Sequence, residues 1–100
     1  MAAFVALLTI HLHFPDAGSL KAKRKDLSSI KAQLQTRLGA AVSEVDHQDL
    51  WQRSTLAAAV VGGSQSAVSD HADRVARFLD ARLPQGVRVE RTIAAFEEIV

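Results

Sequence analysis

Apolar residues along this chain are spaced as in a strand in some segments and as in a helix in others. The order of these strand-like and helix-like segments is compatible with only a few folds. Apolar residues alternate in segment 3–13, as in a strand with one buried face, and recur at helical spacing in segment 20–38. The expected elements are, in chain order, strand 3–13, helix 20–38, strand 40–46, strand 51–61, helix 65–83 and a last strand from 87 to about 97. This β-α-β-β-α-β order predicts an α+β, ferredoxin-like fold.

The predicted fold places both helices on one face of a four-stranded antiparallel sheet with strand order 4-1-3-2. Residues 1–100 are expected to form one such domain, because this length is near the usual size for a single core. Segment 3–13 would meet the helices with one set of alternate residues. The other set, which includes Val5 and Leu7, would leave apolar surface on the open face and so predicts a homodimer partner or a bound ligand there.

The composition excludes some classes of protein. Cysteine is absent, which rules out disulfides and thiolate metal sites. The apolar segment 2–8 is too short to span a membrane and has no basic run before it, so neither a signal peptide nor a membrane span is expected. We therefore expect a cytoplasmic protein without a membrane partner.

The net charge of +1 conceals one strongly basic segment. Segment 20–38 carries six basic residues against one acid, a local net charge of +5, whereas the rest of the chain carries six basic and ten acidic residues, a net of −4. The six basic residues are Lys21, Lys23, Arg24, Lys25, Lys31 and Arg37. Such clustering favours a local contact with an anionic partner, and the alternative is an ordinary solvated helix face.

The predicted topology brings two distant polar segments to one end of the domain. The first helix begins at the same end as the turn between the second and third strands, so Lys21 and Arg24 are expected near Asp46 and Asp49. Cations in the first turn of a helix are unfavourable, because the helix dipole is positive there. An anion at this end, either a carboxylate from the turn or a phosphate of a partner, would offset that cost.

Lys23 is expected on the core-facing side of the first helix, because at about 100° per residue it falls between Leu27 and Ile30. Its ammonium group must then reach the rim of the core, where it is hydrated or paired. The predicted internal partner is Asp46 or Asp49. A structural salt-bridge cluster and a contact with a ligand both remain open for this lysine.

Three runs of the sequence are distinctive when taken together: His13-Phe14-Pro15, Ser19-Leu20-Lys21-Ala22-Lys23-Arg24 and, within segment 41–53, Asp46-His47-Gln48-Asp49-Leu50-Trp51-Gln52-Arg53. In these runs, and over nearly its whole length, the chain resembles the YlxP-like family of small bacterial domains of unknown function. The resemblance implies a ferredoxin-like fold. Genes of that family often lie among genes for translation and ribosome maturation, which implies a connection with RNA or the ribosome. The family has no established catalytic residues to transfer.

The histidines raise metal binding and catalysis as alternatives. His11 and His13 share one face of the first strand and His47 would lie near them, but this spacing alone is weak evidence for a metal site. His47 between Asp46 and Asp49 would suit acid–base chemistry, although neighbouring side chains in a turn point in different directions. No phosphate-binding loop, dinucleotide glycine motif or nucleophile elbow accompanies them. We therefore expect no metal, no cofactor and no enzymatic activity.

Trp51 lies at the junction between the turn and the third strand, where a tryptophan commonly closes the end of the core. We expect that role rather than base stacking. The open sheet face also lacks the exposed aromatic residues of an RRM domain, since it offers mainly His11 and His13 on its first strand. Any RNA contact is therefore expected from the first helix and the turns, through phosphate and shape.

The preferred hypothesis is a non-enzymatic domain that contacts structured RNA or a ribosomal particle. The residues predicted to contact phosphate are Lys21, Lys23, Arg24, Lys25 and Lys31, with His47 and Arg53 positioning the edge. The alternative is a protein-interaction or small-ligand module, a dimer that uses its open face around Leu7, Thr9 and His11. A small hydrolase or metal-dependent enzyme is a third hypothesis, and it predicts bound metal.

Overall fold

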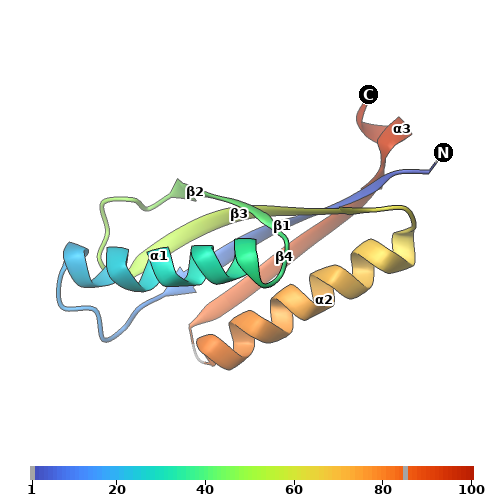
Figure 1. The fold of residues 1–100 in the computed structure, drawn as a ribbon. Helices are drawn as coiled ribbons and strands as arrows, with labels where there is room; N and C mark the ends of the chain where they lie inside the picture. The colour runs from blue at the N-terminus through green and yellow to red at the C-terminus, as the bar shows by residue number, and fades with distance from the viewer. Residues whose placement is uncertain (1, 85) are drawn as a thin grey trace.

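The computed structural model describes residues 2–84 and 86–100, and it contains the predicted order of elements with one addition (Figure 1). The elements are β1 (Phe4–His13), α1 (Leu20–Thr36), β2 (Ala41–Asp46), β3 (Arg53–Gly62), α2 (Gln65–Arg82), β4 (Val87–Ala95) and α3 (Phe96–Ile99). The sheet order is β2-β3-β1-β4 with antiparallel neighbours. The predicted ferredoxin-like α+β fold and its strand order are therefore confirmed.

Several element ends differ from the prediction by one or two residues, and helix α1, for example, ends at Thr36 rather than at residue 38. The third strand begins later than expected, at Arg53, because the residues before it form a loop whose polar groups bond to other segments. The last strand ends at Ala95, where the chain turns into the short helix α3. The Ala95 N–H donates to Glu98 Oε1 at 2.9 Å, and the Phe96 N–H donates to the Ala3 carbonyl at 2.8 Å. These bonds end the strand before residue 97.

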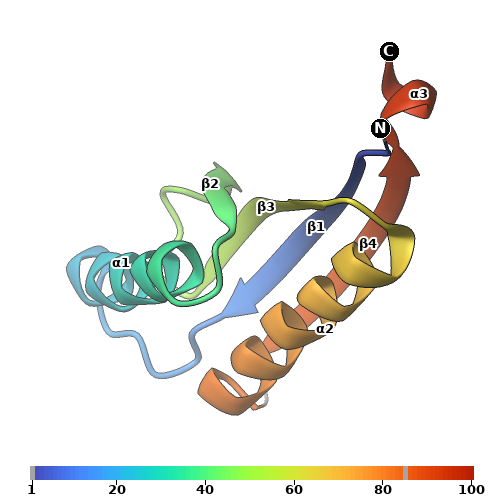
Figure 2. The same cartoon turned by 45° about the vertical axis from the view of Figure 1, so that its right-hand side comes forward.

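Both long helices lie against the same face of the sheet (Figures 1 and 2). Along β1 every second residue from Ala6 to Leu12 is buried, and these side chains meet a buried stripe from each helix. The stripe residues are Leu27, Ile30 and Leu34 on α1 and Val68, Ala72, Val75 and Leu79 on α2. Removal of this apolar surface from water is the main favourable term in forming the layer.

Serine side chains begin both long helices. Ser19 Oγ accepts a hydrogen bond from the Ala22 N–H and Ser64 Oγ from the Ala67 N–H, each at 3.1 Å. After α1 the chain reverses at Gly39, whose φ of 64° is left-handed and suits a glycine at the end of a helix. Among the described residues, no helix has both the length and the apolar character needed to span a membrane.

The open face of the sheet divides into an apolar half and a polar half. The apolar half lies toward the chain termini and includes Leu7 and Val61, which are 51% and 76% exposed. The polar half lies toward the start of α1, where the same strands carry His11, His13 and Arg53. Leu7 is thus exposed as predicted, whereas the partner that would cover it stays a prediction.

Candidate nucleic-acid interface

The loop between β2 and β3 is tied to the start of α1 and to the segment before that helix. Arg24 Nη2 donates to the Gln48 carbonyl at 3.3 Å. On the other side of the loop, the Gln52 side-chain amide donates to the Pro15 carbonyl at 3.3 Å, and the Phe14 N–H donates to the Gln52 carbonyl at 2.8 Å. The predicted meeting of the two polar segments at one end of the fold is therefore confirmed.

Lys23 lies fully buried at the centre of this connection. Its ammonium group donates to the His47 carbonyl at 2.8 Å, to the Gln48 carbonyl at 3.4 Å and to Glu44 Oε2 at 3.2 Å. The predicted internal ion pair is present, but its acidic partner is Glu44, so the prediction of an aspartate from the turn was wrong. Lys23 has no exposed surface to offer a phosphate, which argues against its predicted contact with RNA.

A bulge in β2 explains why Glu44 is the partner. The pairing of β2 with β3 shifts between Glu44 and Asp46, so Val45 is an extra residue in the strand. Glu44 faces the helix side of the sheet, where Ser54 Oγ donates to its carboxylate at 2.6 Å. Asp46 remains exposed, and its carboxylate accepts from the backbone N–H of His47 at 2.8 Å.

The carboxyl group of Glu44 is held in its ionised form. Burial acts to raise its pKa, but the hydrogen bonds from Ser54 and Lys23 and the charges of Lys23 and Arg24 outweigh that effect, so the pKa lies below its ordinary value. The side chain of Glu44 is 12% exposed, against 0% for Lys23, so the pair lies at the boundary of the core. Removal of either partner would leave the other charge poorly compensated.

His47 has a φ of 62°, a left-handed conformation that is uncommon for a residue other than glycine. Its carbonyl accepts from Lys23 Nζ and also from the Leu50 N–H at 3.2 Å, which holds the turn. Its imidazole Nδ1 lies 3.0 Å from Thr55 Oγ1. Because Thr55 pairs with His11 in the sheet, the ring of His47 lies on the open-face side and not among the cations of α1.

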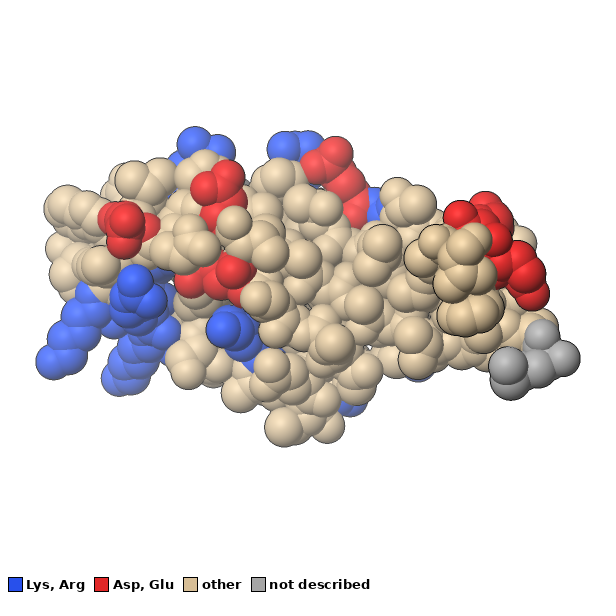
Figure 3. All heavy atoms as spheres, turned by 90° about the horizontal axis from the view of Figure 1, so that it is seen from above, with Lys and Arg blue, Asp and Glu red and all other residues tan. Residues whose placement is uncertain are grey.

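Four basic side chains of α1 reach the surface, and none of them forms an ion pair with a described residue. They are Lys21, Arg24 and Lys25, which are exposed, and Lys31, which is half-buried. Basic side chains project at the end where α1 begins, with acidic ones nearby, whereas the end that holds the termini shows acidic side chains (Figure 3). Arg24 and Lys31 also border a groove of about 370 Å³ between α1 and β2, which Glu44 closes on the sheet side.

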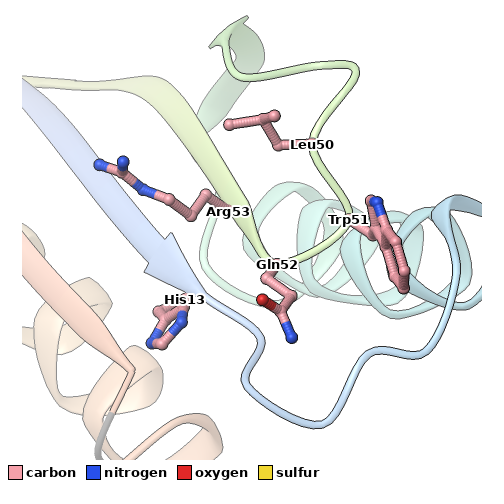
Figure 4. Close-up of a pocket in the computed structure, with 5 residues that line it drawn as sticks. All are labelled: His13, Leu50, Trp51, Gln52 and Arg53. Atoms are coloured by element: carbon pink, nitrogen blue, oxygen red, sulfur yellow. The ribbon is translucent and has the colours of Figure 1, made fainter.

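Trp51 is 52% exposed and does not close the core, so that prediction was wrong. Phe14 is the aromatic residue that is buried at this end, where it follows β1 and joins the core. Figure 4 shows Trp51 and Arg53 on opposite sides of Gln52. The aromatic surface of Trp51 is therefore available on the loop that Arg24 holds, as base stacking requires.

Glu90 and Arg88 of β4 join His11 on the open face. Glu90 Oε1 lies 2.6 Å from His11 Nε2 and 3.2 Å from Arg88 Nη1. The hydrogen bond with His11, followed by the charge of Arg88, lowers the pKa of Glu90. Neither residue of β4 stands out in the sequence, and the available signal is the pairing of the first and last strands, which sets Arg88 opposite His11. Within residues 2–84 and 86–100, no three histidine or carboxylate side chains converge as a metal site would require.

A family described as "Protein of unknown function (DUF503)" matches residues 5–93. The uncharacterised protein YlxP of Bacillus subtilis (strain 168) is 38% identical over 82 residues, which make up 82% of this chain and 85% of that protein. The de novo designed protein Foldit4 has a TM-score of 0.61 at 10% identity, with 92% of this chain and 96% of that chain covered. A VAO-type flavoprotein from Myceliophthora thermophila C1 has a TM-score of 0.58 at 13% identity, with 97% and 17% covered. At such identities the two structures show a likeness of fold alone.

Proposed function

Because this chain belongs to the DUF503 family, which is described as having unknown function, we propose its function from its own surface: it is a non-enzymatic protein that binds structured RNA or a ribosomal particle. The contacts are made to phosphate groups by the exposed cations of α1. These residues are Lys21, Arg24, Lys25 and Lys31. The role lies in translation or ribosome maturation in the cytoplasm.

The observation that carries this proposal is a set of cations next to an exposed tryptophan at one end of the molecule. The first turn of α1 contains no acidic residue, so Lys21 and Arg24 add to the positive end of the helix dipole. That arrangement is unfavourable in isolation and becomes favourable when a phosphate group is bound. Trp51 supplies aromatic surface on the adjoining loop.

The expected recognition is of charge and shape. Lysine and arginine side chains on a helix contact phosphates without reading base edges. An unpaired base that protrudes from a loop or bulge of the RNA would stack on Trp51. The preferred ligand is therefore a folded RNA with at least one unstacked base, rather than a regular duplex.

The direct test measures binding of a fluorescent RNA hairpin at a series of salt concentrations. The variant Lys21→Glu/Lys25→Glu should bind more weakly, and the slope of log affinity against log salt should fall by roughly 1.5 for two lost phosphate contacts. The matched control is Arg74→Glu/Arg77→Glu, which makes the same charge change at exposed positions on α2. Affinity equal to wild type in the α1 variant, or an equal loss in the control, contradicts the proposal.

A second test uses the cell lysate. The tagged protein should co-sediment with ribosomal particles at low salt, and the association should weaken as salt rises because counterions compete for the phosphates. The Lys21→Glu/Lys25→Glu variant should be absent from those fractions. Absence of the wild-type protein from every particle fraction at low salt would count against the ribosomal form of the proposal.

A second candidate function, a homodimer through the open face, is favoured by one observation. Leu7 is half-exposed beside a shallow groove of about 280 Å³ that is bordered by Ala41, Ala57 and Ala59. An exposed side chain and a groove of small residues on one patch are self-complementary under two-fold symmetry. Light scattering at micromolar concentration should give the mass of a dimer, and Leu7→Asp should give a monomer. A monomer mass for the wild type contradicts this candidate.

A further inference from the structure

On the open face of the sheet, on the side opposite α1, we propose a second phosphate-binding site formed by His13, Arg53 and Arg88. Its ligand is a phosphate group. The assignment of that group to an RNA strand rests on the proposed function, whereas the site itself does not depend on it. Arg88 does not stand out in the sequence, and the sequence predicts for Arg53 only a positioning role at the edge of the RNA contact.

The register of the sheet places the side chains of this site on one face. His13 pairs with Arg53 across β1 and β3, and His11 pairs with Arg88 across β1 and β4. Because His11 and His13 are two residues apart in a strand, their side chains lie on the same side of the sheet. Two adjoining hollows of about 270 and 260 Å³ share His13 and Arg53 in their walls, and the second is also bordered by Arg88. Cations thus border both hollows, which together are called the trough here.

The charge of the trough is only partly compensated. Glu90 lies beside the trough on β4, and its carboxylate is already shared between His11 and Arg88. Arg53 and His13 form no ion pair with any residue that the structure describes. Guanidinium groups offer planar pairs of N–H donors that match phosphate oxygens, and an imidazole adds a further donor. A phosphate group is the anion that this donor set fits.

The rim of the domain lies between the trough and the cations of α1. Leu50 and Trp51 are 45% and 52% exposed and border the hollow that also contains Arg53 (Figure 4). A strand that carries phosphates would meet Lys21 on one side of this rim and Arg53 on the other. The exposed apolar surface between them would contact a base. A single RNA strand that passes over the rim would therefore contact cations on both faces of this end of the domain.

The test uses the whole chain with isotope labels in NMR titrations. Inorganic pyrophosphate is added first, and a short single-stranded oligoribonucleotide without a terminal phosphate is added to a second sample. The signals followed are the imidazole C–H groups of His11 and His13. Arg53→Ala/Arg88→Ala should weaken binding at least tenfold, whereas the matched control Arg74→Ala/Arg77→Ala should bind as wild type does. All four arginines are exposed, so both variants are expected to fold, and the dispersion of the amide spectrum checks this.

Saturable shifts of the His13 signal with pyrophosphate, lost in Arg53→Ala/Arg88→Ala, support the site. Shifts with the oligoribonucleotide alone also support it and assign the phosphate to a nucleic-acid strand. The site is overturned if His13 shows no saturable shift with either probe, or the same shift in the double variant. Lys21→Glu/Lys25→Glu should leave the pyrophosphate shifts unchanged, so failure of RNA binding at α1 and failure of this site are told apart.

Discussion

The two ends of the sheet are built from the same strands but carry opposite kinds of surface. At the end where α1 begins, an internal pair of Lys23 and Glu44 holds a loop, and basic side chains project from the surface with acidic ones nearby. At the end that holds the termini, an apolar cleft of about 510 Å³ is bordered by Val61 and Phe96, which are 76% and 52% exposed. One internal ion pair thus connects helix and loop at the cationic end, whereas the described residues at the other end contain no comparable internal ion pair.

The largest expected effect on stability comes from removing the ion pair between Lys23 and Glu44. Lys23→Met should lower the free energy of unfolding by about 3–5 kcal/mol, because Glu44, whose side chain is only 12% exposed, would keep its charge without its cationic partner. Urea denaturation measures the loss. The double variant Lys23→Met/Glu44→Gln should recover part of it, and Val61→Ala at the other end should change stability by less than about 0.5 kcal/mol. If Lys23→Met cost no more than Val61→Ala, the contrast between the two ends would be wrong.

The next effect concerns binding rather than stability. Trp51→Ala should weaken binding of the RNA hairpin by about 1–3 kcal/mol, the usual contribution of one stacked base. Its stability should stay close to wild type, because the ring contributes little to the core. Phe96→Ala is the matched control, since Phe96 is equally exposed, at 52%, at the opposite end. Equal RNA affinities for the two variants would exclude a stacking role for Trp51.

Lowering the pH should destabilise the protein through protonation of Glu44. The folded pKa of Glu44 lies below the unfolded value of about 4.5, so its contribution is fully present above that pH and is lost as the pH falls through the folded pKa. The free energy of unfolding, measured from about pH 6 to about pH 3, should therefore fall more steeply for wild type than for Glu44→Gln. Parallel curves would show that Glu44 is not a source of the acid sensitivity.

The smallest effect tests the conflict between the dipole of α1 and its cations. Lys21→Glu should raise the free energy of unfolding by about 0.3–1 kcal/mol, because it replaces a cation in a first turn that has no acid. The same variant should bind RNA more weakly. Gln65→Glu at the start of α2 should stabilise by a similar or smaller amount without any change in RNA affinity. Thermal unfolding measures both, and a lower melting temperature for Lys21→Glu would contradict the argument.

The fold could be predicted because the relevant signals are local. The alternation in β1 and the apolar stripes of the two long helices specify which face each element buries, and the order of elements then gives the topology. The same reasoning placed the loop next to α1. It also identified Lys23 as a residue that faces inward and needs an acidic partner, which the structure bears out.

The details of the site depend on features without a local signal. The extra residue Val45 decides that Glu44 faces Lys23, and a shift of one residue in a strand exchanges its faces. Phe14 and Trp51 compete for the end of the core, and the choice depends on the path of the loop rather than on either residue type. Arg88 meets His11 only through a pairing between the first and last strands. The local spacing of residues therefore predicts none of these three features.

The central position of β1 has a consequence for the synthesis of the chain. Leu12 pairs with Ser54 on one side and with Val87 on the other, so β1 leaves the ribosome long before either neighbour exists. Pairings between such distant segments slow folding, and unpaired strand edges in a nascent chain invite association with other chains. Of the four strands of the sheet, β1 is made before the others and is the last to have both of its edges paired. Aggregation should be a hazard of the nascent chain far more than of the finished protein.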